Sequence, residues 1–142
     1  MHTIRQILME KGQDIHSVAS GDTVFDAIRK MAELGIGALL VVDDGRLAGV
    51  VSERDYARKV ILEGRASRET RVGEIMSAPA ITIDPRASAD AGLALMTKKR
   101  IRHLPVTDGD ELLGVVSIGD LVNAVLGDQR QLIEQLERYV TG

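Results

Sequence analysis

The 142-residue sequence contains no cysteine and no tryptophan, and it has only one phenylalanine and two tyrosines. The absence of cysteine excludes disulfides, thiolate metal ligands and cysteine nucleophiles, and it is consistent with a reducing cytosol. With so few aromatic residues, the chain lacks the stacking platforms on which proteins bind single-stranded nucleic acid. The core must therefore be built from Val, Ile, Leu, Ala and Met.

The sequence also lacks a strong net charge and a long apolar run. Its formal net charge is −3, which argues against binding to bulk DNA, because such binding needs a clustered basic surface. The N-terminus has no apolar run of the kind found in signal peptides, and no segment approaches the roughly 18 apolar residues that span a bilayer. We therefore expect a cytoplasmic, globular protein with no DNA partner and no membrane association.

What the sequence does contain is an internal repeat. Residues 49–55 read G-V-V-S-E-R-D, and residues 114–120 read G-V-V-S-I-G-D. The two copies lie 65 positions apart, and such self-similarity indicates units that each bury an apolar face against a neighbour. We expect a first repeat at residues 1–66, a second at 67–127 and a separate C-terminal segment at 128–142.

Each repeat predicts the order strand, helix, strand, strand, helix, which gives an α+β fold with α/β-like units. Thr23 and Ser88 are typical N-cap residues, and helical apolar spacing follows each of them. Dense apolar runs then predict paired strands joined by Asp-Gly hairpin turns. The expected strands are 15–19, 38–42 and 47–51 in one copy and 80–84, 104–106 and 112–116 in the other, with second helices at 53–63 and 118–126.

A final helix is expected after Gly127, with Asp128 as its N-cap. Its apolar residues fall on one stripe, which has no counterpart between the repeats. The stripe is either a lid on the shared core or an oligomer contact; it comprises Leu132, Ile133, Leu136 and Val140.

The repeated motif has two interpretations. Ser52 and Ser117, each followed three residues later by an aspartate, match the capping box at a helix start. The same strand-to-helix turn also exposes free N–H groups that bind anions, and an aspartate one turn in can accept two hydroxyl hydrogens, as a ribose diol requires. The glycine that opens each motif permits close backbone approach. The second interpretation predicts a nucleoside phosphate site.

The order of elements, the two Gly-x-x-Ser-x-x-Asp motifs and the stretch R-H-L-P-V at 102–106 together resemble a tandem pair of cystathionine-β-synthase (CBS) domains, or Bateman module. The resemblance covers about residues 3–127. It implies a pseudo-twofold module of two facing sheets flanked by helices, with two clefts between the repeats that bind adenine nucleotides. It also implies that the modules pair into homodimers.

Carried over to this sequence, the resemblance assigns the ribose to Asp55 and Asp120 and the phosphate to Ser52 and Ser117. In the family each cleft also takes residues from the opposite repeat. The cleft of Asp55 is then expected to include Ile83, Asp84, Ile101 and Arg102. The cleft of Asp120 is expected to include Ala19, Ser20, Ile36 and Gly37.

The two clefts are expected to differ in charge. In the alignment of the repeats, Arg102 and His103 face Gly37 and Ala38, and Arg54 faces Gly119. We therefore include Arg54 and His103 among the ligand-binding candidates, and the two clefts need not prefer the same nucleotide.

No pattern in the sequence predicts catalysis. It contains no nucleophile paired with a base, no metal-ligand spacing and no phosphate-binding loop of the Walker type. We expect a non-enzymatic regulatory module, without catalytic cofactor or metal, that binds AMP, or else ADP, ATP or NAD(H), and acts in trans on a partner the sequence does not identify. The alternatives are a structural dimerisation module that binds no ligand and a module that binds S-adenosylmethionine.

Overall fold

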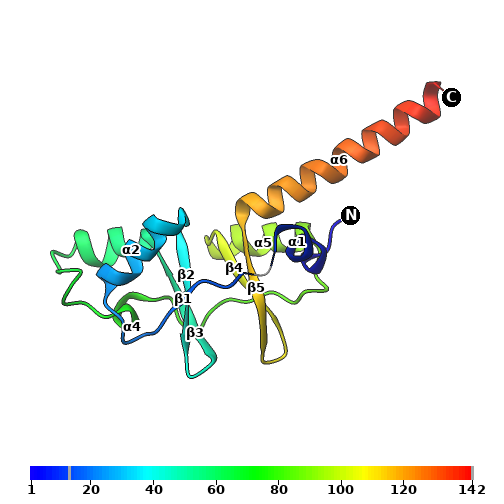
Figure 1. Ribbon diagram of the computed structural model, residues 1–142. Helices are drawn as coiled ribbons and strands as arrows, with labels where there is room; N and C mark the ends of the chain where they lie inside the picture. The colour runs from blue at the N-terminus through cyan, green and yellow to red at the C-terminus, as the bar shows by residue number, and fades with distance from the viewer. Residues whose placement is uncertain (13, 142) are drawn as a thin grey trace. The chain divides into compact units, whose positions relative to one another are not determined.

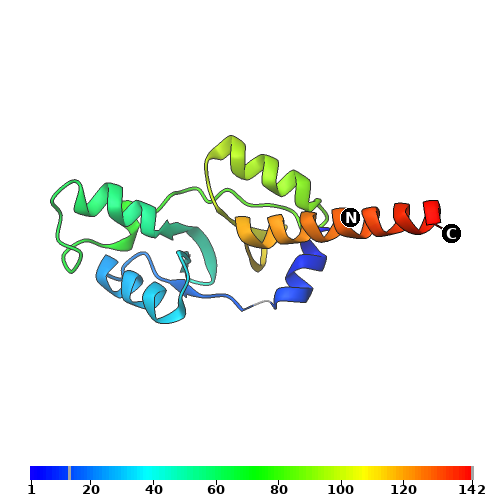
Figure 2. The same ribbon diagram turned by 90° about the horizontal axis from the view of Figure 1, so that it is seen from above.

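The computed structural model describes residues 1–12 and 14–141 of the chain (Figures 1 and 2). It divides into two compact units, one made of Ile15–Ile81 and the other of Met1–Asp14 together with Thr82–Gly142. Each unit combines helices with a small sheet, as the predicted α+β class requires.

The unit of residues 15–81 is built on a three-stranded sheet in the order β1-β2-β3, in which β1 runs parallel to β2 and β2 runs antiparallel to β3. Helix α2 begins after Thr23, whose side chain accepts the N–H of Asp26 as predicted for an N-cap. The expected second helix is α3 followed by the single π-helical turn η1. The elements are β1 (Ser17–Val18), α2 (Val24–Leu34), β2 (Ala38–Asp43), β3 (Arg46–Ser52), α3 (Glu53–Tyr56), η1 (Ala57–Ile61) and α4 (Val72–Ile75).

The hairpin between β2 and β3 turns where the sequence predicted it. Asp44 and Gly45 have φ angles of 51° and 76°, the pair of positive values that a two-residue type I′ turn demands. Aspartate followed by glycine is favoured there because both tolerate left-handed backbone.

The second unit repeats this plan with a two-stranded antiparallel sheet of β4 and β5. Ser88 caps α5 by accepting the N–H of Ala91. The strand predicted at 80–84 is reduced to a single parallel bridge between Ile83 and Val106. The elements are α1 (Ile4–Lys11), α5 (Ala89–Lys99), β4 (His103–Asp108), β5 (Glu111–Ser117) and α6 (Ile118–Thr141).

The compact units do not share the boundaries of the sequence repeats, because the short helices α1 and α4 pack against elements of the other repeat. At the start of α1, the N–H of Ile4 donates to the carbonyl of Ala87 at 2.9 Å. At the start of α4, the N–H of Val72 donates to the carbonyl of Asp22, also at 2.9 Å. Each unit is therefore completed by the helix that precedes the other repeat in the chain.

The predicted break at Gly127 is absent, and α6 is one continuous helix from Ile118 to Thr141. A single glycine inside a helix costs only about 1 kcal/mol, and its neighbours continue the helical pattern. Asp128 is not an N-cap; its carboxylate instead accepts hydrogen bonds from His2. The prediction of a separate final helix capped by Asp128 was therefore wrong.

The cores are aliphatic, as the scarcity of aromatic residues required. The largest fully buried side chains include Met31, Leu39, Leu40, Val41 and Val51 in one unit and Ile4, Leu8, Met96, Leu104 and Leu121 in the other.

No helix in the described part of the chain combines the length and the apolar character needed to cross a bilayer.

Candidate functional site

The first copy of the motif forms a turn between β3 and α3. The N–H of Ser52 donates to Asp55 Oδ2 at 3.0 Å, and the N–H of Asp55 donates to Ser52 Oγ at 3.2 Å. The Ser52 hydroxyl also bonds Asp55 Oδ2 at 3.0 Å. The predicted capping box is confirmed, and it fixes the carboxylate of Asp55 beside the free N–H groups that open the helix.

The second copy forms the same turn between β5 and α6. The N–H of Ser117 donates to Asp120 Oδ2 at 2.8 Å, and the N–H of Asp120 donates to Ser117 Oγ at 3.2 Å. The repeated sequence thus builds one local structure twice, with a serine and an aspartate locked together at a helix N-terminus.

A lysine ammonium lies against each of the two carboxylates. Lys59 Nζ is 3.2 Å from Asp55 Oδ1 and also donates to the carbonyl of Ile75 at 2.9 Å. Lys11 Nζ is 2.6 Å from Asp120 Oδ2 and donates to the carbonyl of Val115 at 3.0 Å. Neither lysine was among the predicted site residues.

The two lysines come from different places in the fold. Lys59 lies one helical turn beyond Asp55, and the equivalent position in the second repeat is Ala124. Lys11 ends α1, and the equivalent position in the second repeat, three residues beyond Met76, is Pro79. The two sites therefore have the same kind of charge partner from unrelated positions. The i,i+4 spacing of Asp55 and Lys59 could have revealed one of them, but no local pattern points to Lys11.

The pKa of Asp120 is held below its ordinary value. Partial burial acts in the opposite direction, since it disfavours the charged form. The hydrogen bond from the Lys11 ammonium and the N–H of Ser117 outweigh that effect. Asp120 is therefore an ionised hydrogen-bond acceptor at neutral pH.

The predicted residues Gly37 and Arg102 lie at the two turns through their main chains. The carbonyl of Gly37 accepts the N–H of Glu53 at 3.0 Å, and the carbonyl of Arg102 accepts the N–H of Ile118 at 2.8 Å. His103 is the register partner of Ser117 on the neighbouring strand. Arg102 and His103 thus lie beside the Ser117 turn, and Gly37 lies beside the Ser52 turn.

Three further predicted residues lie in hydrogen-bonded loops. The N–H of Ala19 donates to Asp22 Oδ2 and the N–H of Ser20 donates to Asp43 Oδ1, both at 2.9 Å. Asp84 Oδ1 accepts from the N–H and the Nε of Arg86 at 2.8 and 2.9 Å. The side-chain bond from Arg86 lowers the pKa of Asp84, so a ligand there would meet a carboxylate already paired with a guanidinium.

The predicted clefts combine residues from both compact units, which are described separately. The grouping of Asp55 with Ile83, Asp84, Ile101 and Arg102, and of Asp120 with Ala19, Ser20, Ile36 and Gly37, therefore stays a prediction. Arg54 lies in the first turn of α3, and Ile36 and Ile101 are half-buried just before β2 and β4.

The glycine that opens each motif lies against another segment of its own unit. A Cβ on Gly49 would lie 2.6 Å from the carbonyl oxygen of Ser77, and a Cβ on Gly114 would lie 3.0 Å from Cδ2 of Leu8. The close approach expected at these glycines is therefore made by the segment after α4 in one unit and by α1 in the other.

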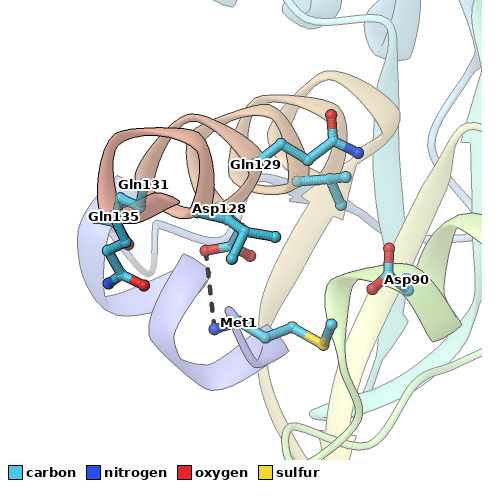
Figure 3. A pocket seen from close by; sticks show the side chains of 8 residues that line it. Met1, Asp90, Asp128, Gln129, Gln131 and Gln135 are labelled. Atoms are coloured by element: carbon cyan, nitrogen blue, oxygen red, sulfur yellow. Dashed lines mark ion pairs between the residues drawn. The ribbon is translucent and has the colours of Figure 1, made fainter. Parts of the chain in front are cut away.

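A pocket of about 340 Å³ lies at the base of the projecting part of α6 (Figure 3). Its wall includes the ion pair of Asp128 with the N-terminal ammonium of Met1, 3.9 Å apart. None of the predicted nucleotide-binding residues lines it. Within residues 1–12 and 14–141, no group of three or more His, Cys, Asp or Glu side chains is arranged to hold a metal ion.

In a comparison with known protein families, one family model matches the chain twice. The model of the CBS domain matches residues 4–62 and again residues 72–127. The mitochondrial CBS domain-containing protein CBSX3 of Arabidopsis thaliana is 40% identical over 149 residues, which cover 99% of this chain and 72% of that protein.

Solved structures agree with the sequence matches. A protein with CBS domains from Burkholderia ambifaria, described as a candidate signal-transduction protein, is 54% identical with a TM-score of 0.86, over 90% of this chain and 96% of that one. The hexameric CBS-CP12 protein of bloom-forming cyanobacteria is 29% identical with a TM-score of 0.77, over 86% of this chain and 70% of that one. This second relative shows that proteins of similar fold form oligomers.

Proposed function

The chain belongs to the CBS-domain family, whose paired domains are generally regulatory modules, and on this premise we propose that it is a sensor of adenine nucleotides. AMP is the favoured ligand, with ADP, ATP and NAD(H) as further candidates. The module binds the ligand at the Ser-x-x-Asp turns, carries out no chemistry on it, and acts in trans on a regulated partner. A ligand can drive such a response only through different affinities for two states of the module.

The observation that supports this proposal best is the pair of equivalent turns. Each turn places free helical N–H groups next to a carboxylate that is already fixed by its own serine. N–H groups suit a phosphate, and an oriented carboxylate suits the two hydroxyls of a ribose. At Asp120 both the Ser117 N–H and Lys11 bond Oδ2, so Oδ1 is the oxygen assigned to the ribose.

A purely structural module is the second candidate, and the completeness of the capping boxes favours it. Each serine and aspartate satisfies the other, which accounts for both residue types without a ligand. The two candidates differ in what they predict for added nucleotide, because only a ligand that binds the folded state stabilises it.

Thermal unfolding with a panel of ligands tests the proposal. At about 100 times its Kd, a ligand adds roughly 2.7 kcal/mol of stability, which raises the Tm by about 5 °C or more in a chain of this size. The panel comprises AMP, ADP, ATP, NADH, S-adenosylmethionine and adenosine, with GMP as the control for the base. Mass spectrometry of small molecules retained by the purified protein identifies a native ligand directly.

Two variants separate binding from capping. Asp55→Asn keeps an oxygen that can accept the N–H of Ser52 but removes the carboxylate, so it should lose part of the ligand-induced shift while folding normally. Ser88→Ala removes the cap of α5, outside the motif. The lost cap costs roughly 1 kcal/mol of stability, which should lower the Tm of the free protein but leave the full ligand-induced shift. If no ligand of the panel changes the Tm and none is retained, the protein is a structural module.

A further inference from the structure

The second half of α6, residues 129–140, is exposed along its whole length, and we call it the outer half. In its own unit it extends away from α1, α5 and the β4-β5 hairpin (Figures 1 and 2). Its apolar side chains are nevertheless large and numerous. The exposed fractions are 56% for Leu132, 54% for Ile133, 56% for Leu136, 87% for Tyr139 and 82% for Val140.

The apolar residues of α6 follow the spacing of a coiled coil. From Val122 onward, the residues of one stripe recur alternately every four and every three positions, which is the a and d pattern of a heptad. Position a holds Leu126, Ile133 and Val140, and position d holds Val122, Gln129 and Leu136. A stripe of this period matches a second helix packed side by side with the first.

The outer half would gain stability from such a partner. About 12 exposed residues of helix are marginal in water by themselves, because most helical stability in proteins comes from packing an amphipathic face. Large exposed apolar patches on one side of an element mark interaction surfaces. The question is which helix covers this one.

We propose that the outer half pairs with the outer half of a second copy of this chain, in antiparallel orientation. The pairing is centred between residues 134 and 135, so that Ile133 of each copy packs against Leu136 of the other. Leu132 and Tyr139, which occupy position g, face each other at the edge of the seam. The inference is independent of nucleotide binding.

The charges beside the stripe select this orientation and register. Position e holds Arg130 and Glu137, and in the antiparallel pair these residues face each other across the seam, once on each half of the dimer. A shift by one heptad would bring Arg130 opposite its own copy. A parallel pair would place Glu137 against Leu132 and would form no ion pair at this position. Residues at e and g set the orientation of coiled coils, and here they favour the antiparallel form.

The mass of the full-length protein in solution is the first test. Light scattering up to about 100 μM, which populates dimers of micromolar Kd, should show an assembly larger than the monomer. Leu136→Glu should halve that mass, and Gln131→Glu, at an exposed position on the outside of the pair, should leave it unchanged. A monomeric wild type, or a Leu136→Glu variant of unchanged mass and unchanged helix content, would overturn the proposal.

Charge reversal tests the register. Arg130→Glu and Glu137→Arg should each weaken the association at least tenfold, because each places two like-charged pairs across the seam. An equal mixture of the two variants should recover wild-type affinity, since one copy then carries two glutamates and the other two arginines. Failure of the mixture to associate better than either variant alone would exclude this register.

Cross-linking tests the orientation. Because the sequence contains no cysteine, only the introduced cysteines can form a disulfide. A mixture of Ile133→Cys and Leu136→Cys chains should form a disulfide between unlike chains under mild oxidation. Leu136→Cys alone should remain largely uncross-linked, because the two 136 positions are apart in the antiparallel pair. Efficient cross-linking of Leu136→Cys with itself would instead show a parallel pair and refute the orientation.

Discussion

Lys11 and Asp120 are 109 positions apart in the chain, yet the Lys11 ammonium lies 2.6 Å from Asp120 Oδ2. The lysine ends α1, and the aspartate lies in the first turn of α6. This contact makes the second copy of the motif a charged site in which one carboxylate oxygen, Oδ2, is already engaged. A ribose that binds Asp120 through Oδ1 must share the negative charge of the carboxylate with that lysine.

Replacing Lys11 with methionine should therefore strengthen the binding of adenosine, which carries no phosphate to interact with the lysine. An ion pair that is partly exposed contributes about 0.2–1 kcal/mol, so the gain is at most about fivefold. Isothermal titration calorimetry of adenosine measures it. The matched control is Lys59→Met, which removes the equivalent cation from Asp55 and should affect only the other site.

If Lys11→Met weakens adenosine binding, the lysine contacts the ligand directly and does not compete with it for Asp120. If the two lysine variants have identical effects on both sites, the sites are not distinguished by these cations.

The sequence predicted the parts of the fold that depend on local chemistry. The caps at Thr23 and Ser88 and the turn at Asp44-Gly45 follow from side-chain hydrogen bonding and allowed φ angles, and all are confirmed. The family model also matches the chain twice, at 4–62 and 72–127, so the two repeats expected from the doubled motif are confirmed.

The features that the sequence did not predict depend on distant contacts. The exchange of α1 and α4 between repeats rests on hydrogen bonds such as that of Ile4 to Ala87, and no periodicity encodes these. The continuity of α6 was missed because Gly127 and Asp128 together match a helix end and a new cap. In the folded chain Asp128 is bound by His2, 126 positions away.

Gly49→Ala should destabilise the unit of residues 15–81. The added Cβ would lie 2.6 Å from the carbonyl oxygen of Ser77, and a backbone atom cannot move away without distorting the bonds between β3 and that segment. Overpacking of this kind costs about 1–3 kcal/mol, measured as a lower midpoint in urea unfolding. Gly114→Ala is the matched control, because its Cβ would meet a flexible leucine side chain at 3.0 Å and should cost less. Equal losses would mean that the Ser77 carbonyl is not the constraint.

Arg102→Ala should weaken AMP binding about tenfold or more while changing adenosine binding little, since a hydrogen bond to a charged group contributes about 1.5–3 kcal/mol. Lys99→Ala, on the exposed end of α5, is the control for general loss of positive charge. Equal losses for AMP and adenosine would remove Arg102 from the phosphate site.

The same variant assigns Arg102 to a site. The family resemblance places Arg102 in the site of Asp55. In the structure, however, the carbonyl of Arg102 accepts the N–H of Ile118 at the turn that holds Asp120. We expect the effect of Arg102→Ala to vanish in an Asp120→Asn background. If it vanishes in an Asp55→Asn background instead, the resemblance gives the correct pairing.

The contact of the N-terminus with α6 should depend on pH through His2. Its ring lies 2.7 Å from Asp128 Oδ1 and 3.1 Å from Glu10 Oε1. The hydrogen bond to Asp128 raises the pKa of His2 above 6.5, and the backbone bond from His2 lowers the pKa of Asp128 below 3.8.

The raised pKa of His2 means that its contribution to stability is fully present below pH 6.5 and is lost as the pH rises through the folded value. The lowered pKa of Asp128 means that its contribution is present above pH 3.8 and is lost as the pH falls through the folded value. Together they predict the strongest contact between about pH 4 and 6.5. Wild type should therefore exceed His2→Ala in Tm at pH 5.5, and the difference should shrink by pH 8.5. NMR titration of the His2 ring gives its pKa directly, and a value at or below 6.5 would contradict the ion pair.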